Sequence, residues 1–246
     1  MVRGNHRPGS SGSIDDARLS RRGARPAARG VTIVELLVGI AIGLLIIAAG
    51  IVFLTNNMRD QRGLLLESRL MHDLRTAADL ITRDLRRAGY WGASADGIWV
   101  PGSTSVSANP YEAVAPSGAA SDAVGFRYSR DATENGSVDS NEQFGFRLRN
   151  GALEMQIGAG NWQALTDTGT LTVTAFSVTP SVQQISLGEA CPADCVVGST
   201  SCPPRLSVRS LAVQISGKAV ADVTVVRSVR SDVRLRNDAL AGSCTI

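Results

Sequence analysis

The sequence predicts an α+β fold in which one long N-terminal α-helix packs on a C-terminal antiparallel β-sheet domain. An uncharged apolar run covers residues 36–54. Apolar residues then recur at spacings of three and four as far as Leu85, which is the pattern of one helix face. Alternating apolar residues flank Asn150 and Gly151 farther along the chain, as in a β-hairpin. We therefore expect a single helix over about residues 31–88, followed by strands.

The apolar run is long enough to cross a membrane. The nineteen residues Leu36–Leu54 contain no charge, and an α-helix needs about 20 residues to span the hydrocarbon layer. We therefore expect residues 31–54 to form a transmembrane helix. Glu35 is a lone carboxylate at the start of this span, and such a charge is costly unless it finds a partner.

The residues before the span form a specific pattern. Gly30 is followed by an apolar segment that carries Glu35 at its fifth position. This pattern resembles the N-terminal signature of type IV prepilins and type II secretion pseudopilins. The resemblance implies that residues 1–30 are a leader, removed by an inner-membrane prepilin peptidase that also methylates Val31 as the new N-terminus. It further implies that Glu35 meets the positively charged N-terminus of a neighbouring subunit. Val31 departs from the Phe that the family usually has there.

Two simpler interpretations explain this segment less well. A secretory signal has a shorter apolar stretch, followed by a cleavage site of small residues, whereas this run is followed by Thr55-Asn56-Asn57. An ordinary membrane anchor can have an apolar run of this length, but it gives no reason for Glu35 at the cytoplasmic end of the span.

Charge predicts the orientation of the anchor. The chain has a net charge of +3, but residues 1–30 hold seven Arg and two Asp, a net of +5, which leaves −2 for the remainder. Because positive flanks stay cytoplasmic, we expect the N-terminus inside a bacterial inner membrane and the C-terminal domain in the periplasm. We expect no nucleic-acid partner, since the basic segment that would support such a role is the part expected to be removed.

Two glycines in the span, Gly39 and Gly43, are four residues apart. Small residues at this spacing permit close helix packing. Packing against neighbouring subunits and simple tolerance of glycine in a membrane helix both remain open.

Residues 55–89 predict an amphipathic continuation of the helix. Its apolar positions fall on one face, with charged residues on the others, and Gly89 is placed to end it. The expected buried positions are Leu70, Leu74, Ala77, Ala78, Ile81 and Leu85. The following run, Arg83 to Gly92, resembles the end of the long helix in PilW-like minor pilins, and Tyr90 and Trp91 are expected to pack back on the helix end.

Residues 90–121 predict an irregular connection, and residues 122–246 a β-sheet domain with a cysteine-bearing loop. The clearest hairpin surrounds Asn150-Gly151, because this dipeptide between alternating runs is a strong turn signal. The closing strands resemble those of PilW-like and J-type pseudopilin chains. The expected strands are residues 122–129, 144–148, 153–157, 170–178, 206–216 and 223–235.

The four cysteines fall in the last quarter of the chain, at Cys191, Cys195, Cys202 and Cys244. An even number in a periplasmic domain predicts two disulfides, with the pairing open among three connectivities. Cys244 is placed to tie down the C-terminus. Zinc is the competing interpretation, but the paired Cys-x2-Cys units of zinc ribbons are absent from this sequence.

Residues 131–142 have the spacing of a twelve-residue calcium loop, with Gly136 at the turn position. The candidate ligands are Asp131, Thr133, Asn135, Ser137, Asp139 and Glu142. An acidic, flexible hairpin connection is the alternative. Calcium is the one cofactor that the sequence suggests, and none is required.

The sequence does not predict an enzyme. Its two histidines are His6, in the leader, and His72, among charged helix residues, so no base is placed to activate a nucleophile. Two classes of function stay open. The first is a minor pilin that helps to initiate type IV pilus assembly and enters the filament at the cell surface, or its runner-up, a J-like pseudopilin of type II secretion. The second is a membrane-anchored, calcium-responsive binding domain. For a minor pilin the expected partners are other minor pilins, the major pilin, prepilin peptidase and a tip adhesin.

Overall fold

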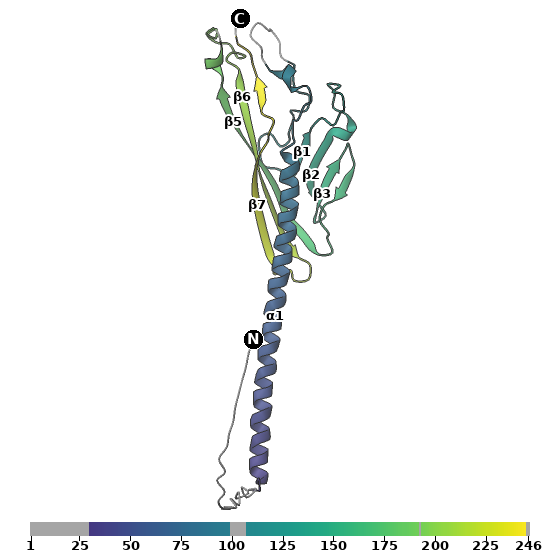
Figure 1. The fold of residues 1–246 in the computed structure, drawn as a ribbon, viewed down its shortest axis with the longest axis vertical. Coiled ribbons are helices and arrows are strands. Elements are labelled where there is room, and N and C mark those ends of the chain that lie inside the picture. Colours follow the sequence, from purple (N-terminus) through teal and green to yellow (C-terminus); the bar gives the residue numbers. More distant parts are fainter. Residues whose placement is uncertain (1–29, 99–106, 192, 245–246) are drawn as a thin grey trace, which may run out of the picture. The chain divides into compact units, whose positions relative to one another are not determined.

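A computed structural model describes residues 30–98, 107–191 and 193–244, and the chain forms two units, residues 1–54 and 55–246. Helix α1 runs continuously over Ile33–Leu85 and belongs to both units (Figure 1). It contains no proline, so every position after its first turn can keep the intrahelical hydrogen bond. The predicted α+β fold class is confirmed.

Two four-stranded antiparallel sheets form the second unit together with the second half of α1. The first sheet has the order β1 (Ala123–Arg127), β2 (Gln143–Arg149), β3 (Ala152–Ile157) and β4 (Trp162–Ala164). In the second, β6 (Arg205–Ala219) pairs on one side with β5 (Leu171–Ser186), and on its other side with β7 (Val226–Arg234) and then β8 (Ala239–Ala241). Short 3-10 turns cover Ser94–Gly97, Ser140–Glu142 and Gly188–Ala190.

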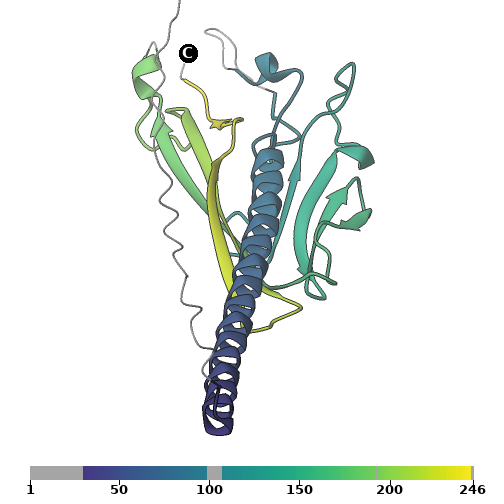
Figure 2. The same cartoon turned by 60° about the horizontal axis from the view of Figure 1, so that its bottom comes forward.

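The second half of α1 lies against both sheets (Figure 2). Its apolar face joins side chains of both sheets in a single core, with Leu74, Ile81 and Leu85 completely buried. The six helix positions expected to be buried are all buried: Leu70, Leu74, Ala77, Ala78, Ile81 and Leu85.

The turn between β2 and β3 has the backbone that its sequence predicts. Asn150 and Gly151 have φ values of 50° and 77°, which a two-residue type I′ hairpin turn requires at both positions. Gly151 also accepts a hydrogen bond of 2.8 Å from the Val173 N–H of β5. A pair of backbone bonds between Ser121 and Val178 supplies a second link between the segment before β1 and β5.

Several features differ from the expectation. The helix begins at Ile33, ends at Leu85 and is followed by a turn, because Gly89 has φ +74° and donates its N–H to Arg127 O. Two sheets form where one was expected, β5 runs eight residues beyond Val178, and the short strands β4 and β8 are additional. Trp91 is buried, with its ring close to Gly97, whereas Tyr90 stays 51 % exposed.

Candidate functional site

The segment Gly30–Thr32 lies outside the helix and leads into its first turn. The Thr32 hydroxyl accepts the N–H of Glu35 at 3.2 Å, and its carbonyl oxygen accepts the N–H of Leu36. Thr32 is therefore the N-cap of α1, with Glu35 at the third helical position. The backbone between Gly30 and Val31 is consequently free of helical hydrogen bonding.

Glu35 carries its charge in the first turn of the helix. A carboxylate there is stabilised by the free N–H groups of the helix start. Among the described ion pairs none includes Glu35, and the side chain is exposed. Its carboxylate can therefore accept a cation from outside the described chain.

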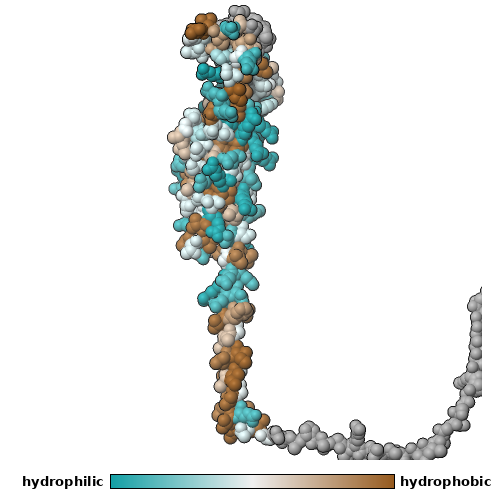
Figure 3. Space-filling model, turned by 90° about the vertical axis from the view of Figure 1, so that its left-hand side faces the viewer, coloured by the Kyte–Doolittle hydropathy of each residue, from teal (hydrophilic) through white to brown (hydrophobic). Residues whose placement is uncertain are grey.

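Residues 36–54 of the helix present an apolar surface, shown in brown along the lower part of the helix in Figure 3. The helix is long and apolar enough to cross a membrane, and its most apolar window has no buried residue, so it is compatible with a single-pass anchor. At Gly39 and Gly43 an added Cβ would meet no atom within 4 Å. Packing inside the described chain therefore gives no reason for these two glycines.

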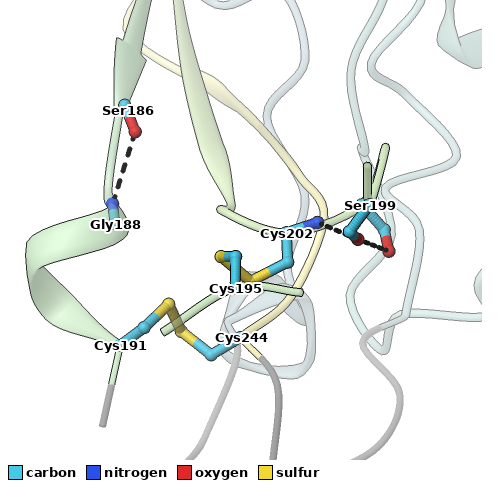
Figure 4. The surroundings of a disulfide bond; sticks show 8 residues. Ser186, Gly188, Cys191, Cys195, Ser199, Cys202 and Cys244 are labelled. Carbon is cyan, nitrogen blue, oxygen red and sulfur yellow. Dashed lines mark hydrogen bonds between the residues drawn. A yellow bond between two sulfur atoms is a disulfide. The ribbon is translucent and has the colours of Figure 1, made fainter. Parts of the chain in front are cut away.

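The four cysteines form two disulfides at the far end of the β5–β6 ribbon (Figure 4). Cys191 is bonded to Cys244 across 53 residues, and Cys195 to Cys202 across 7. Loop closure of these lengths stabilises a fold by about 4 and about 2.5 kcal/mol in the chain-entropy account. All four sulfur atoms are thus bonded, which leaves no thiolate for zinc, and the C-terminal segment is tied to the loop after β5.

The last residue of the expected calcium loop, Glu142, is completely buried. Its carboxylate accepts the N–H of Arg130 at 2.7 Å and the N–H of Asp139 at 2.8 Å. Asp139 and Glu142 form a capping box around a 3-10 turn, in which each side chain binds a backbone N–H of the other residue. The carboxylate that would close a metal shell is therefore already engaged by backbone donors.

The other candidate ligands also bond within the loop. Asn135 Oδ1 accepts the N–H of Ser137 at 2.7 Å, and Asp131 Oδ2 accepts the N–H of Asn135 at 3.3 Å. Thr133 is exposed. Residues 30–98, 107–191 and 193–244 contain no group of three or more His, Cys, Asp or Glu side chains that could hold a metal ion. Calcium binding by this loop stays a prediction.

Glu134, which the sequence did not single out, ties this loop to the end of the helix. Its Oε2 accepts the N–H of Gly92 at 3.0 Å, and its Oε1 lies 3.0 Å from the hydroxyl of the buried Tyr111. Burial raises the pKa of the Tyr111 hydroxyl. Burial also acts to raise the pKa of Glu134, but hydrogen bonds from Ser129, Gly92 and Tyr111 outweigh it and lower that pKa below its ordinary value of 4.5.

The structure thus separates the residues that the sequence singled out. Gly30, Val31 and Glu35 lie together at the start of the helix, and the cysteines form a second group in the other unit. Sequence inspection missed Thr32, although Thr-x-x-Glu before an apolar run is a readable capping signal. Glu134 carried no comparable signal, because its partners are 23 and 42 residues away.

The chain matches a known protein family over most of its length. A family model described as prepilin peptidase-dependent protein B matches residues 63–235. The matched segment begins after the apolar span, so it is independent of the pattern at Gly30 and Glu35. No curated protein and no solved structure matches the chain.

The lowered pKa of Glu134 predicts a pH dependence. A carboxyl with a depressed pKa in the folded state stabilises the fold above its unfolded pKa, and this stability is lost as pH falls through the folded pKa. The unfolding midpoint in urea should therefore drop less between about pH 6 and about pH 3 for Glu134→Gln than for the wild type. The control is Glu189→Gln, because Glu189 is exposed in the Gly188–Ala190 turn. Its midpoint should drop with pH as much as that of the wild type. Equal pH slopes for the wild type and Glu134→Gln would contradict the assigned hydrogen bonds.

The buried capping box predicts a large loss of stability on truncation. Glu142→Ala leaves two backbone N–H groups without acceptors, so the free energy of unfolding should fall by about 3 kcal/mol, with a smaller loss for Glu142→Gln. Urea unfolding of the purified protein in detergent measures both values. Wild-type stability of Glu142→Ala would show that the box does not hold this loop.

The calcium hypothesis has a separate test in thermal melts. Calcium at a hundredfold excess over its Kd would stabilise the fold by about 2.7 kcal/mol. Melts of the wild type with calcium and with chelator should then differ, and those of Asp131→Ala should coincide. Coincident melts for the wild type would reject calcium as a ligand.

Proposed function

We propose that this chain, which belongs to the family of prepilin peptidase-dependent protein B, is a minor pilin that helps to initiate type IV pilus assembly. Membership of that family supports a pilin-like or pseudopilin-like role. The observation that carries this proposal is the coincidence of two independent features. The family match covers residues 63–235, and the Gly30 and Glu35 pattern lies outside it. The same chain therefore carries a pilin-type domain and a pilin-type start.

Processing is the first step of the proposed function. Prepilin peptidase cleaves after Gly30 on the cytoplasmic side of the inner membrane and methylates the new N-terminus at Val31. The position of Gly30 and Val31 before the first helical turn supports this step, because a protease needs an extended backbone at the bond it cuts. The apolar helix then holds the subunit in the membrane, with residues 55–246 in the periplasm.

Assembly is the second step. The exposed Glu35 pairs with the amine of Val31 of a neighbouring pilin, which replaces a costly lone charge by an ion pair in a low-dielectric setting. Gly39 and Gly43 provide places for close helix contact. The partners are other minor pilins and the major pilin, with the chain near the filament tip and next to a tip adhesin.

A J-like pseudopilin of type II secretion is the second candidate. The closing strands of the domain, β6 and β7, support it as much as the first candidate, because they lie in the region that resembles both PilW-like and J-type chains. The family match fits both candidates. Deletion of the gene separates them, because loss of surface pili supports the first and loss of protein secretion with normal pili supports the second.

The proposed processing predicts the mass of the mature protein. In cells with active prepilin peptidase the purified protein should begin at a methylated Val31. Gly30→Leu should keep the leader, since a large side chain at the cleavage position blocks entry to the peptidase site, whereas Gly39→Leu should be cut normally. Intact-mass analysis distinguishes these products. A wild-type protein that retains residues 1–30 would refute the processing step.

The proposed assembly contact predicts the behaviour of Glu35 variants. Glu35→Gln preserves the size of the side chain but removes the charge, so insertion and cleavage should remain while co-purification with partner pilins falls at least tenfold, the equivalent of about 1.4 kcal/mol. Quantitative pull-down from detergent extracts measures this loss.

Thr32→Ala is the matched control for Glu35→Gln. It removes the N-cap, which costs about 1 kcal/mol of helix stability, but leaves the charge in place. Co-purification should therefore stay close to the wild-type yield. If Thr32→Ala weakens association as much as Glu35→Gln does, the stability of the helix start accounts for the loss. If Glu35→Gln assembles normally, the proposed charge pair does not organise assembly.

A further inference from the structure

A group of arginines lines a pocket where the end of β7 meets the end of α1. β7 runs beside the second half of the helix (Figure 1). At the start of β7 the Arg227 guanidinium donates to Glu67 Oε1 at 2.9 Å, and just beyond its end the Arg236 N–H donates to Arg86 O at 3.4 Å. A pocket of about 380 Å³, here called the arginine pocket, lies at this second contact. Its lining consists of Arg86, Arg234, Leu235 and Arg236.

The local sequence explains how two of these arginines come to lie together. Leu235 is buried in the core, and its N–H donates to Arg209 O at 3.0 Å. The residues before and after it, Arg234 and Arg236, are both exposed. Because side chains of an extended segment alternate between its two faces, burial of Leu235 turns both guanidinium groups outward. Arg86 is the first residue after the helix and is also exposed.

The arginine pocket carries three positive charges and no carboxylate in its lining. Arg234 pairs at 2.8 Å with Asp238, which does not line the pocket. None of the described ion pairs includes Arg86 or Arg236. Residues 99–106, which lie outside the described ranges, contain no charged residue. At least two of the three charges are therefore unbalanced by the described chain.

Neither composition nor the helix dipole accounts for this arrangement. The chain from residue 31 onward has a net charge of −2, so it is not basic as a whole. Cations near a helix C-terminus are stabilised by its partial negative charge, which explains Arg83 and Arg86 but not Arg234 and Arg236, which come from another element. The fold brings these like charges together against their repulsion, and an anion between them would replace repulsion by attraction.

The chemistry of the lining indicates carboxylate or phosphate oxygens as ligands, because a guanidinium group binds either through two parallel N–H···O bonds. Arg234 and Arg236 are two residues apart, which is about 7 Å along an extended segment. Carboxylates at positions i and i+2 of a second extended chain have the same spacing. A water molecule occupies about 30 Å³ of the liquid, so about 380 Å³ accommodates more than one carboxylate.

Phospholipid headgroups of the anchoring membrane are a poor match for this pocket. It lies at the C-terminal end of α1, and the helical residues 55–85 alone extend over about 45 Å at 1.5 Å per residue. The headgroup region of a bilayer is only about 5–7 Å thick on each side. Measured along the helix, the pocket is thus far beyond the headgroups that surround the end of the apolar span. Carboxylates of another protein are the better source.

From this geometry we propose that the arginine pocket binds an extended acidic segment of a partner protein, in which two carboxylates are separated by one residue. One carboxylate binds between Arg86 and Arg236, and the other binds Arg234. Arg234 uses Nη2 for Asp238, so its remaining N–H donors are available. The site requires neither cleavage at Gly30 nor the charge of Glu35, and it does not rest on the proposed function.

The test measures peptide binding to the purified full chain in a neutral detergent by fluorescence anisotropy. The probe is the capped pentapeptide Ser-Asp-Ser-Asp-Ser with an uncharged dye, and it should bind saturably. Ser-Asn-Ser-Asn-Ser lacks the charges and should not bind. Ser-Asp-Asp-Ser-Ser has the same charge as the probe but adjacent carboxylates, so its affinity should be at least threefold lower.

Three variants locate the binding site. Arg86→Gln and Arg236→Gln should each weaken binding of the probe about fivefold, the upper range for one exposed ion pair. Arg149→Gln is the matched control, because Arg149 is an exposed residue of β2 without a described ion pair, and it should leave the affinity unchanged. Every variant keeps residues 1–30, so binding to that basic segment is common to all. Circular dichroism verifies folding, and if one of the two pocket variants is unfolded, the other decides.

Several outcomes would overturn the proposal. Equal affinities of the wild type, Arg86→Gln and Arg236→Gln would place the peptide elsewhere on the chain. Equal affinities for the two acidic peptides would reject an extended segment with this spacing and leave only a general attraction of negative charge. Isothermal titration calorimetry covers small anions. Saturable binding of inorganic phosphate or glycerol 3-phosphate that is lost in Arg236→Gln, with none of the probe, would assign the pocket to a free anion or a lipid headgroup.

Discussion

Burial of one apolar face of the second half of α1 is the interaction on which the rest of the second unit depends. The two sheets are connected directly by few backbone bonds, at Ser121 with Val178 and at Val173 with Gly151. By contrast, side chains of both sheets join those of the helix in one core. Each fully buried leucine or isoleucine, such as Leu74 and Ile81, contributes about 1.5–3 kcal/mol. The helix is thus the common wall that keeps two small sheets in one domain.

The features of the fold that the sequence predicts are those set by residues close together in the chain. The helix face and the Asn150-Gly151 turn follow from spacings of a few residues and from one turn type, so both could be predicted. The division into two sheets could not, because it depends on which strands meet in space. The second half of β5, residues 179–186, was missed since it is polar, uncharged and contains Pro180. The strands β4 and β8 have three residues each, too few for a periodic signal.

The candidate sites follow the same rule. The pattern at Gly30 and Glu35 is contiguous, so the start of the helix could be located, and its cap at Thr32 could have been. The spacing of residues 131–142 suggested calcium, but in the structure Glu142 caps a turn, because buried backbone N–H groups need an acceptor as much as a metal does. Glu134 bonds to Gly92 and Tyr111, residues that only tertiary packing brings to it. No local sequence pattern predicts such a contact.

The two halves of α1 carry different constraints within one continuous helix. Residues 55–85 are apolar on one face, which the sheets cover. Residues 36–54 are apolar on all faces, and the described chain covers none of them. Because every backbone hydrogen bond of this segment is intrahelical, its surroundings can change without cost to the backbone. Lipid and the apolar helices of neighbouring subunits would both suit such a surface. Under the proposed function, the helix would exchange one of these apolar environments for the other on passing from membrane to filament, and Glu35 would be the group of this segment whose free energy changes most.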